Sequence, residues 1–168
     1  MRDGGSSLGR MWRRLVDLLA PRRPPRQPRP TRPAQTTVAY DYDGPVRLLY
    51  APERNGDPDP GEVVWTWVPY EEDPSQGKDR PVVVVGRVLA GRLGDLAVVM
   101  LSSRGHSDDP DWLVLGRGGW DREGRVSSVR LDRVFGVPAD AVRREGATLD
   151  RPRFDKVAQE LRGRHGWV

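Results

Sequence analysis

A chain of 168 residues, of which 36% are hydrophobic and 31% are charged, has room for one modest folded domain with tails. The lack of cysteine excludes disulfides and thiolate metal sites, and the presence of only two histidines argues against a histidine-built metal centre, so we expect neither a metal nor a cofactor. The net charge of +4 is uneven, because residues 1–37 carry +7 and residues 38–168 carry −3, so a nucleic-acid site in the second part would need a local basic patch.

The first 37 residues are predicted to form a basic segment in two parts. Residues 8–20 place apolar side chains at helical spacing among arginines, which predicts a short amphipathic helix ended by Pro21. Residues 21–33 are rich in proline and arginine, which indicates an extended or disordered linker. The helix can lie on a membrane surface or dock on a partner, and the arginines can tether nucleic acid. A tail that orders only in part is the other interpretation.

Residues 38–60 are predicted to be a turn-rich lead-in, with Val46–Tyr50 as an edge strand. The folded domain is predicted over residues 61–168 and opens with three apolar runs, each expected to be a strand: Gly61–Val68, Val82–Val85 and Leu96–Leu101. The second run, a short β-branched stretch, indicates a strand that is buried on both faces. Pro81 fits only as its first residue, because proline has no N–H to donate within a ladder.

Two polar residues stand at the ends of these predicted strands. Arg80 follows the polar loop over residues 69–79 and directly precedes Pro81, whereas Ser102 directly follows the third apolar run. If the two strands pair, an arginine guanidinium and a serine hydroxyl meet at one rim of the sheet. A planar cation and a hydroxyl together suit the oxygens of a phosphodiester.

Beyond these strands, His106 lies in a polar loop over residues 104–111, four positions after Ser102. A loop histidine is either an acid or base in a reaction or simply a solvated side chain, and the sequence leaves both interpretations open. Tryptophans are numerous for a small domain and can stack on bases. Packing is the interpretation favoured for Trp65 and Trp112, because both lie in apolar runs.

The C-terminal part is predicted to end in an amphipathic helix. Two elements are expected before it: a strand over Val126–Val134 and a short helical turn over Pro138–Arg144. The helix begins near Asp150 or Pro152 and ends at Gly163 or Gly166, with one apolar face made of Phe154, Val157, Ala158 and Leu161. Trp167 is expected to pack back on the domain.

Roughly residues 60 to 167 resemble the MazF/PemK toxins of type II toxin–antitoxin systems. The resemblance rests on four motifs in order: Gly61-Glu-Val-Val-Trp65, the loop pair Gln76-Gly77, Arg80-Pro81-Val-Val-Val-Val85, and an apolar strand that ends in Ser102-Ser103. It implies an α+β fold, with a small, strongly bent, mainly antiparallel, SH3-like barrel sheet of five to seven strands and a C-terminal helix. It also implies a homodimer and metal-independent cleavage of single-stranded RNA at short sequences.

The resemblance also implies roles for individual residues. Arg80 matches the family's catalytic arginine, and Ser102 matches a position that is usually threonine, where the hydroxyl is kept. The residues expected to bind RNA are Gln76, Gly77, Lys78, Ser103, Arg104 and His106. Ser75 departs from the pattern, because many members carry an acidic residue there. A base from this loop would then have to be Glu71, Glu72 or Asp73, unless the chain does without one.

The sequence thus predicts a sequence-selective endoribonuclease toxin that leaves 2′,3′-cyclic phosphate and 5′-hydroxyl ends. The expected partners are single-stranded mRNA, a second copy of the chain, a cognate antitoxin, and DNA through the toxin–antitoxin complex. No apolar run approaches the ~20 residues of a membrane span, and we expect a cytoplasmic protein. Two alternatives stay open: a non-catalytic member of the same fold that binds a protein such as a topoisomerase, and an interaction protein that works through its basic tail.

Overall fold

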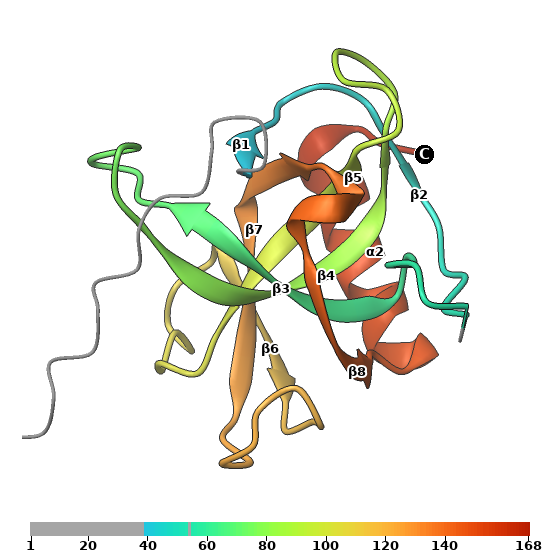
Figure 1. Ribbon diagram of the computed structural model, residues 1–168. Coiled ribbons are helices and arrows are strands. Elements are labelled where there is room, and N and C mark those ends of the chain that lie inside the picture. The colour runs from blue at the N-terminus through green and yellow to red at the C-terminus, as the bar shows by residue number, and fades with distance from the viewer. Residues whose placement is uncertain (1–38, 54) are drawn as a thin grey trace, which may run out of the picture. The chain divides into compact units, whose positions relative to one another are not determined.

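The computed structural model describes residues 39–53 and 55–168 (Figure 1). The helix predicted over residues 8–20 and the linker predicted over residues 21–33 lie outside the described residues. No helix within these two described stretches is long and apolar enough to cross a membrane.

Eight strands form one sheet in which every pair of neighbours is antiparallel, and one α-helix follows them. The elements in chain order are β1 (Tyr40–Asp41), β2 (Val46–Leu48), β3 (Glu62–Pro69), β4 (Gly77–Val88), β5 (Leu96–Ser102), β6 (Trp112–Gly116), β7 (Ser127–Val137), the 3₁₀ turn η2 (Ala139–Ala141), β8 (Arg143–Thr148) and α2 (Arg151–His165). The main path across the sheet is β1-β7-β5-β4-β3-β8. β2 pairs with β4, and β6 pairs with β7.

The sheet is strongly curled, and its two longest strands explain how. The first half of β4 pairs with β3 and its last residues pair with β2. The first part of β7 pairs with β6 and its last part with β1. β5 lies between β4 and β7 and pairs with both. Register shifts, which bend and twist strands, occur in β4 and in β5. Gly86, at the shift in β4, would place a Cβ only 2.0 Å from the carbonyl oxygen of Arg47, so β2 can pair there only against glycine.

The hydrophobic core lies on both faces of the central strands, as predicted for the second apolar run. Val83 and Val85 of β4 belong to one buried cluster, which the apolar side chains of α2 complete. Val82 and Val84 belong to a second cluster on the opposite face. In Figure 1, α2 covers one face of the curled sheet.

The C-terminal helix agrees closely with the sequence prediction. The side chain of Asp150 accepts a hydrogen bond from the backbone N–H of Arg153 as the N-cap, and Gly166 ends the helix with φ of 68°. The buried face is the predicted one: Phe154, Val157, Ala158 and Leu161. Trp167 packs back into the core. The predicted α+β fold, with a strongly bent antiparallel sheet and a C-terminal helix, is therefore confirmed.

Three details differ from the prediction. The structure has eight strands rather than five to seven, because β1 and β8 add short pairings at the edges. The helical turn predicted over Pro138–Arg144 is limited to Ala139–Ala141. β4 begins at Gly77, so Pro81 lies within it rather than at its start. Pro81 is tolerated because β4 pairs with β5 only from Val82 onward. On the side that faces β5, no backbone hydrogen bond is therefore required from Pro81, which has no N–H to donate.

Candidate active site

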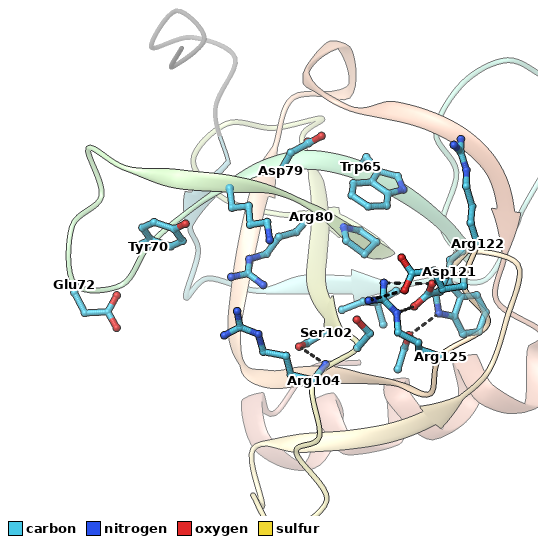
Figure 2. Close-up of a pocket in the computed structure, with 17 residues that line it drawn as sticks. Trp65, Tyr70, Glu72, Asp79, Arg80, Ser102, Arg104, Asp121, Arg122 and Arg125 are labelled. Atoms are coloured by element: carbon cyan, nitrogen blue, oxygen red, sulfur yellow. Dashed lines mark hydrogen bonds and ion pairs between the residues drawn. The ribbon is translucent and has the colours of Figure 1, made fainter. Parts of the chain in front are cut away.

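A pocket of about 950 Å³ opens where the pairing of β4 with β5 ends, at one rim of the sheet (Figure 2). Val82 lies opposite Met100 in this antiparallel pair, so the residue two before Val82 and the residue two after Met100 share that rim. These residues are Arg80 and Ser102, and both line the pocket. The pairing that the sequence left conditional is present, and it brings the predicted arginine and serine together.

Arg80 is a half-buried cation in this pocket. Burial lowers the pKa of Arg80 from its ordinary value, Tyr70 opposes that shift, and the positive charge of Arg104 adds to it. An arginine stays protonated despite such a shift. No carboxylate among the described residues pairs with Arg80. Figure 2 shows Arg80 and Arg104 on the same side of the pocket, an arrangement that a bound anion would stabilise.

Ser102 is held by two neighbours on the loop that follows β5. It is 8% exposed, and its Oγ accepts a hydrogen bond from the backbone N–H of Arg104 at 3.2 Å. The Nε2 atom of His106 lies 3.1 Å from the same oxygen. The His106 ring stacks on Trp112, with 3.8 Å between centroids and 3° between planes. The hydroxyl is therefore fixed in place, and the structure connects His106 to the pocket through Ser102.

The other residues expected to bind RNA divide into two groups. Those that line the pocket are Lys78, Ser103 and Arg104. Gln76 and Gly77 do not line it: the Gln76 amide donates to Asp73 at 2.6 Å, and Gly77 lies so close to β3 that a Cβ there would be 2.6 Å from Nε1 of Trp67. His106 is not a lining residue either.

The three carboxylates of the loop between β3 and β4 differ in their partners and in whether they line the pocket. Ser75, the residue that departs from the family pattern, donates its hydroxyl to Asp73 at 2.5 Å. Hydrogen bonds from Ser75 and Gln76 lower the pKa of Asp73. Glu71 forms an ion pair with Arg130 at 3.0 Å. Of the three loop carboxylates, Glu72 alone lines the pocket, at a distance from Ser102 in Figure 2.

Sequence reasoning missed the wall of the pocket that residues 120–125 contribute. This segment lies between β6 and β7 and carries Asp121, whose pKa is lowered by a hydrogen bond from Arg125 at 2.9 Å. The run of charged residues in this segment could have indicated a functional surface, but only the fold shows that the segment faces the rim of β4 and β5. Trp65, for which packing was the favoured interpretation, is half-buried and lines the pocket, and Trp120 lines the pocket while also belonging to the buried core.

The described residues include no group of three or more His, Cys, Asp or Glu side chains arranged to hold a metal ion. The polar groups that line the pocket are cations, hydroxyls and carboxylates, and the carboxylates of Asp121 and Glu123 pair with Arg125 within it. Their arrangement can bind a phosphodiester and stabilise extra negative charge on it.

Comparison with protein-family models matches residues 59–163 to the PemK-like, MazF-like toxins of type II toxin–antitoxin systems. The match extends over more than half of the chain, from three residues before β3 into the last turn of α2, and so includes the rim of β4 and β5 that carries Arg80 and Ser102. A search of curated proteins finds no match to this sequence.

Proposed function

The chain belongs to the PemK-like, MazF-like toxins of type II toxin–antitoxin systems, and we propose that it is an endoribonuclease that cleaves single-stranded RNA in the pocket at the rim of β4 and β5. Membership of this family implies an antitoxin as its partner. We propose further that the protein is a cytoplasmic homodimer that contacts DNA through the toxin–antitoxin complex. In this account residues 61–168 are the toxin domain and residues 1–37 are an accessory tail.

The observation that carries the proposal is the meeting of Arg80 with Ser102 in a pocket where Arg80 has no carboxylate partner among the described residues. Lys78 and Arg104 line the same pocket. Because residues 38–168 have a net charge of −3, RNA binding requires a local basic patch, and we propose that these cations supply it. The pocket's volume of about 950 Å³ is at the upper end of the range for ligand pockets, which suits an extended substrate.

The proposed reaction is attack by the 2′-hydroxyl of the RNA on the adjacent phosphorus. The bond from phosphorus to the 5′-oxygen of the next nucleotide breaks, leaving a 2′,3′-cyclic phosphate and a 5′-hydroxyl. Arg80 stabilises the additional charge on the pentavalent phosphorane and protonates the leaving oxygen through water, while Ser102 donates a hydrogen bond to a non-bridging oxygen. None of these steps uses a metal ion.

The proton of the attacking 2′-hydroxyl has one route in the loop between β3 and β4. Glu71 is engaged with Arg130, and Asp73 is engaged with Ser75 and Gln76, which disfavours both as bases. Glu72 lines the pocket but lies far from Ser102 in Figure 2, so it would have to accept the proton through a water molecule. We therefore assign the main catalytic effect to Arg80 and Ser102 rather than to a loop carboxylate. Sequence preference would come from unpaired bases that lie in the pocket.

The test uses a long single-stranded RNA, excess EDTA, and three forms of the protein: wild type, Arg80→Ala and Arg87→Ala. Arg87 is the matched control, because it is an exposed arginine of the same strand whose side chain donates to the carbonyl of Gly94 outside the pocket. We expect discrete fragments from wild type and Arg87→Ala and intact RNA from Arg80→Ala. Intact RNA with all three folded proteins would instead support a non-catalytic, protein-binding member of the family.

A further inference from the structure

The Ser102 hydroxyl has a limited hydrogen-bonding capacity, and most of it is already used. A serine hydroxyl has one proton to donate and two lone pairs that accept. One lone pair accepts the backbone N–H of Arg104 at 3.2 Å, and Nε2 of His106 lies 3.1 Å away. Ser102 is 8% exposed, and these two contacts are the ones that the described residues make with its oxygen. Whether His106 donates or accepts therefore decides where the Ser102 proton points.

The two arrangements have opposite consequences for a bound phosphate. If Nε2 of His106 accepts, the Ser102 proton is directed at the imidazole, and a lone pair faces the substrate. If Nε2 carries a proton and donates, both lone pairs of Ser102 are occupied and its proton is available to the pocket. An anionic oxygen beside Ser102 favours the second arrangement, because a donor is attracted to it and a lone pair is repelled.

We infer that His106 is a positioning residue: it donates to Ser102 and so turns the Ser102 hydroxyl proton toward the phosphate being cleaved. This inference deepens the proposed endoribonuclease function and rests on it. His106 was expected from the sequence to bind RNA, yet it does not line the pocket and reaches the site through Ser102. It is accordingly not a catalytic residue in the sense that Arg80 is.

The surroundings of His106 suit a positioning role. Its ring lies flat against Trp112 of β6, with the planes 3° apart, which holds the plane of the imidazole, and within that plane Nε2 is directed at the Ser102 hydroxyl. The loop that carries it is closed by two backbone hydrogen bonds, from Asp109 N–H to the His106 carbonyl at 3.2 Å and from Trp112 N–H to the Asp109 carbonyl at 3.0 Å. The imidazole is therefore held by the sheet on one side and directed at Ser102 on the other.

The test compares three substitutions of His106 in the full-length protein, with kcat and KM measured on an RNA that the wild type cleaves. His106→Phe keeps a ring to stack on Trp112 but removes the nitrogen, so we expect kcat to fall about tenfold with KM little changed, as for the loss of one hydrogen bond. His106→Gln supplies an amide N–H at the end of a side chain of suitable length and should recover most of kcat. His106→Glu can only accept, and its kcat should be no higher than that of His106→Phe.

Two controls separate positioning from a general structural effect. His165→Phe alters the other histidine, which also stacks on a tryptophan, Trp167, and places Nε2 2.9 Å from a carbonyl, but lies outside the pocket; its kcat should equal that of wild type. In a Ser102→Ala background, His106→Phe should cause no further loss of kcat, because the residue through which His106 acts is gone.

Each outcome decides the inference. Wild-type kcat in His106→Phe, an undiminished effect of His106→Phe in the Ser102→Ala background, or an effect confined to KM would overturn it while leaving the endoribonuclease proposal intact. If His106→Phe fails to fold, the comparison of His106→Gln with His106→Glu decides, and equal kcat values would reject the inference. A folded wild type that leaves RNA intact would overturn the proposed function and this inference together.

Discussion

Replacing Ser102 with alanine tests the geometry of the site most closely, because the structure gives the partners that the hydroxyl would lose. In the proposed reaction Ser102 donates to a charged phosphorane oxygen, and a hydrogen bond to a charged group contributes about 1.5–3 kcal/mol. The loss corresponds to a kcat that is about 10- to 100-fold lower. The substitution also leaves the Arg104 N–H without its acceptor, which costs roughly 1 kcal/mol and lowers the melting temperature by a few degrees.

The assay is steady-state cleavage of RNA, combined with thermal unfolding followed by circular dichroism. Ser128→Ala provides the matched control, because Ser128 is a buried serine that lies directly opposite Ser102 across β5 and β7 but does not line the pocket. We expect Ser128→Ala to retain the wild-type kcat. A folded Ser102→Ala with the same kcat as wild type would refute the reasoning that assigns a transition-state hydrogen bond to this hydroxyl.

Three further predictions concern the fold and the tail. Gly86→Ala should destabilise the protein by about 3 kcal/mol or more in urea unfolding, because the added Cβ would lie 2.0 Å from the Arg47 carbonyl oxygen; a loss below 1 kcal/mol would contradict this. Burial, followed by the hydrogen bond to Asp95, raises the pKa of Tyr40 to about 12, so this contribution to stability is full below pH 10 and is lost as the pH rises toward 12. Tyr40→Phe should reduce the loss of stability between pH 10 and pH 12, and an unchanged dependence of stability on pH would contradict the role given to Tyr40. Deleting residues 1–37 should leave RNA cleavage unchanged if residues 61–168 are the toxin domain, whereas lost activity in a folded truncation would favour a working basic tail.

Much of the sheet and the helix could be predicted because their signals are local. Val82–Val85 is a continuous β-branched run, and the α2 boundaries follow from an N-cap aspartate and a C-terminal glycine in the left-handed region. Strand β8 (Arg143–Thr148) lacks such a signal, because its sequence is charged and contains glycine. Its strand conformation comes from pairing with β3, where Arg144 makes two hydrogen bonds with the buried carboxylate of Glu62.

The candidate site shows the same division between local and non-local information. The meeting of Arg80 with Ser102 followed from the sequence on one condition, that the two apolar runs beside them pair, and the structure fulfils that condition. The contact from His106 to Ser102 was not predictable, because spacing along a loop does not determine where a ring points. The wall over residues 120–125 was missed for a related reason: a loop far along the chain reaches the pocket only through the curl of the sheet.

The measurement that tests the central claim most directly uses a short RNA containing the sequence that the wild type cuts, and the same RNA with a single 2′-deoxy nucleotide on the 5′ side of the cleaved bond. The proposed reaction needs that 2′-hydroxyl as its nucleophile. We predict that the unmodified RNA yields a 2′,3′-cyclic phosphate and a 5′-hydroxyl in excess EDTA and that the modified RNA is bound but stays intact. Cleavage of the modified RNA at the same bond would contradict the account, because another nucleophile would then have to attack the phosphorus.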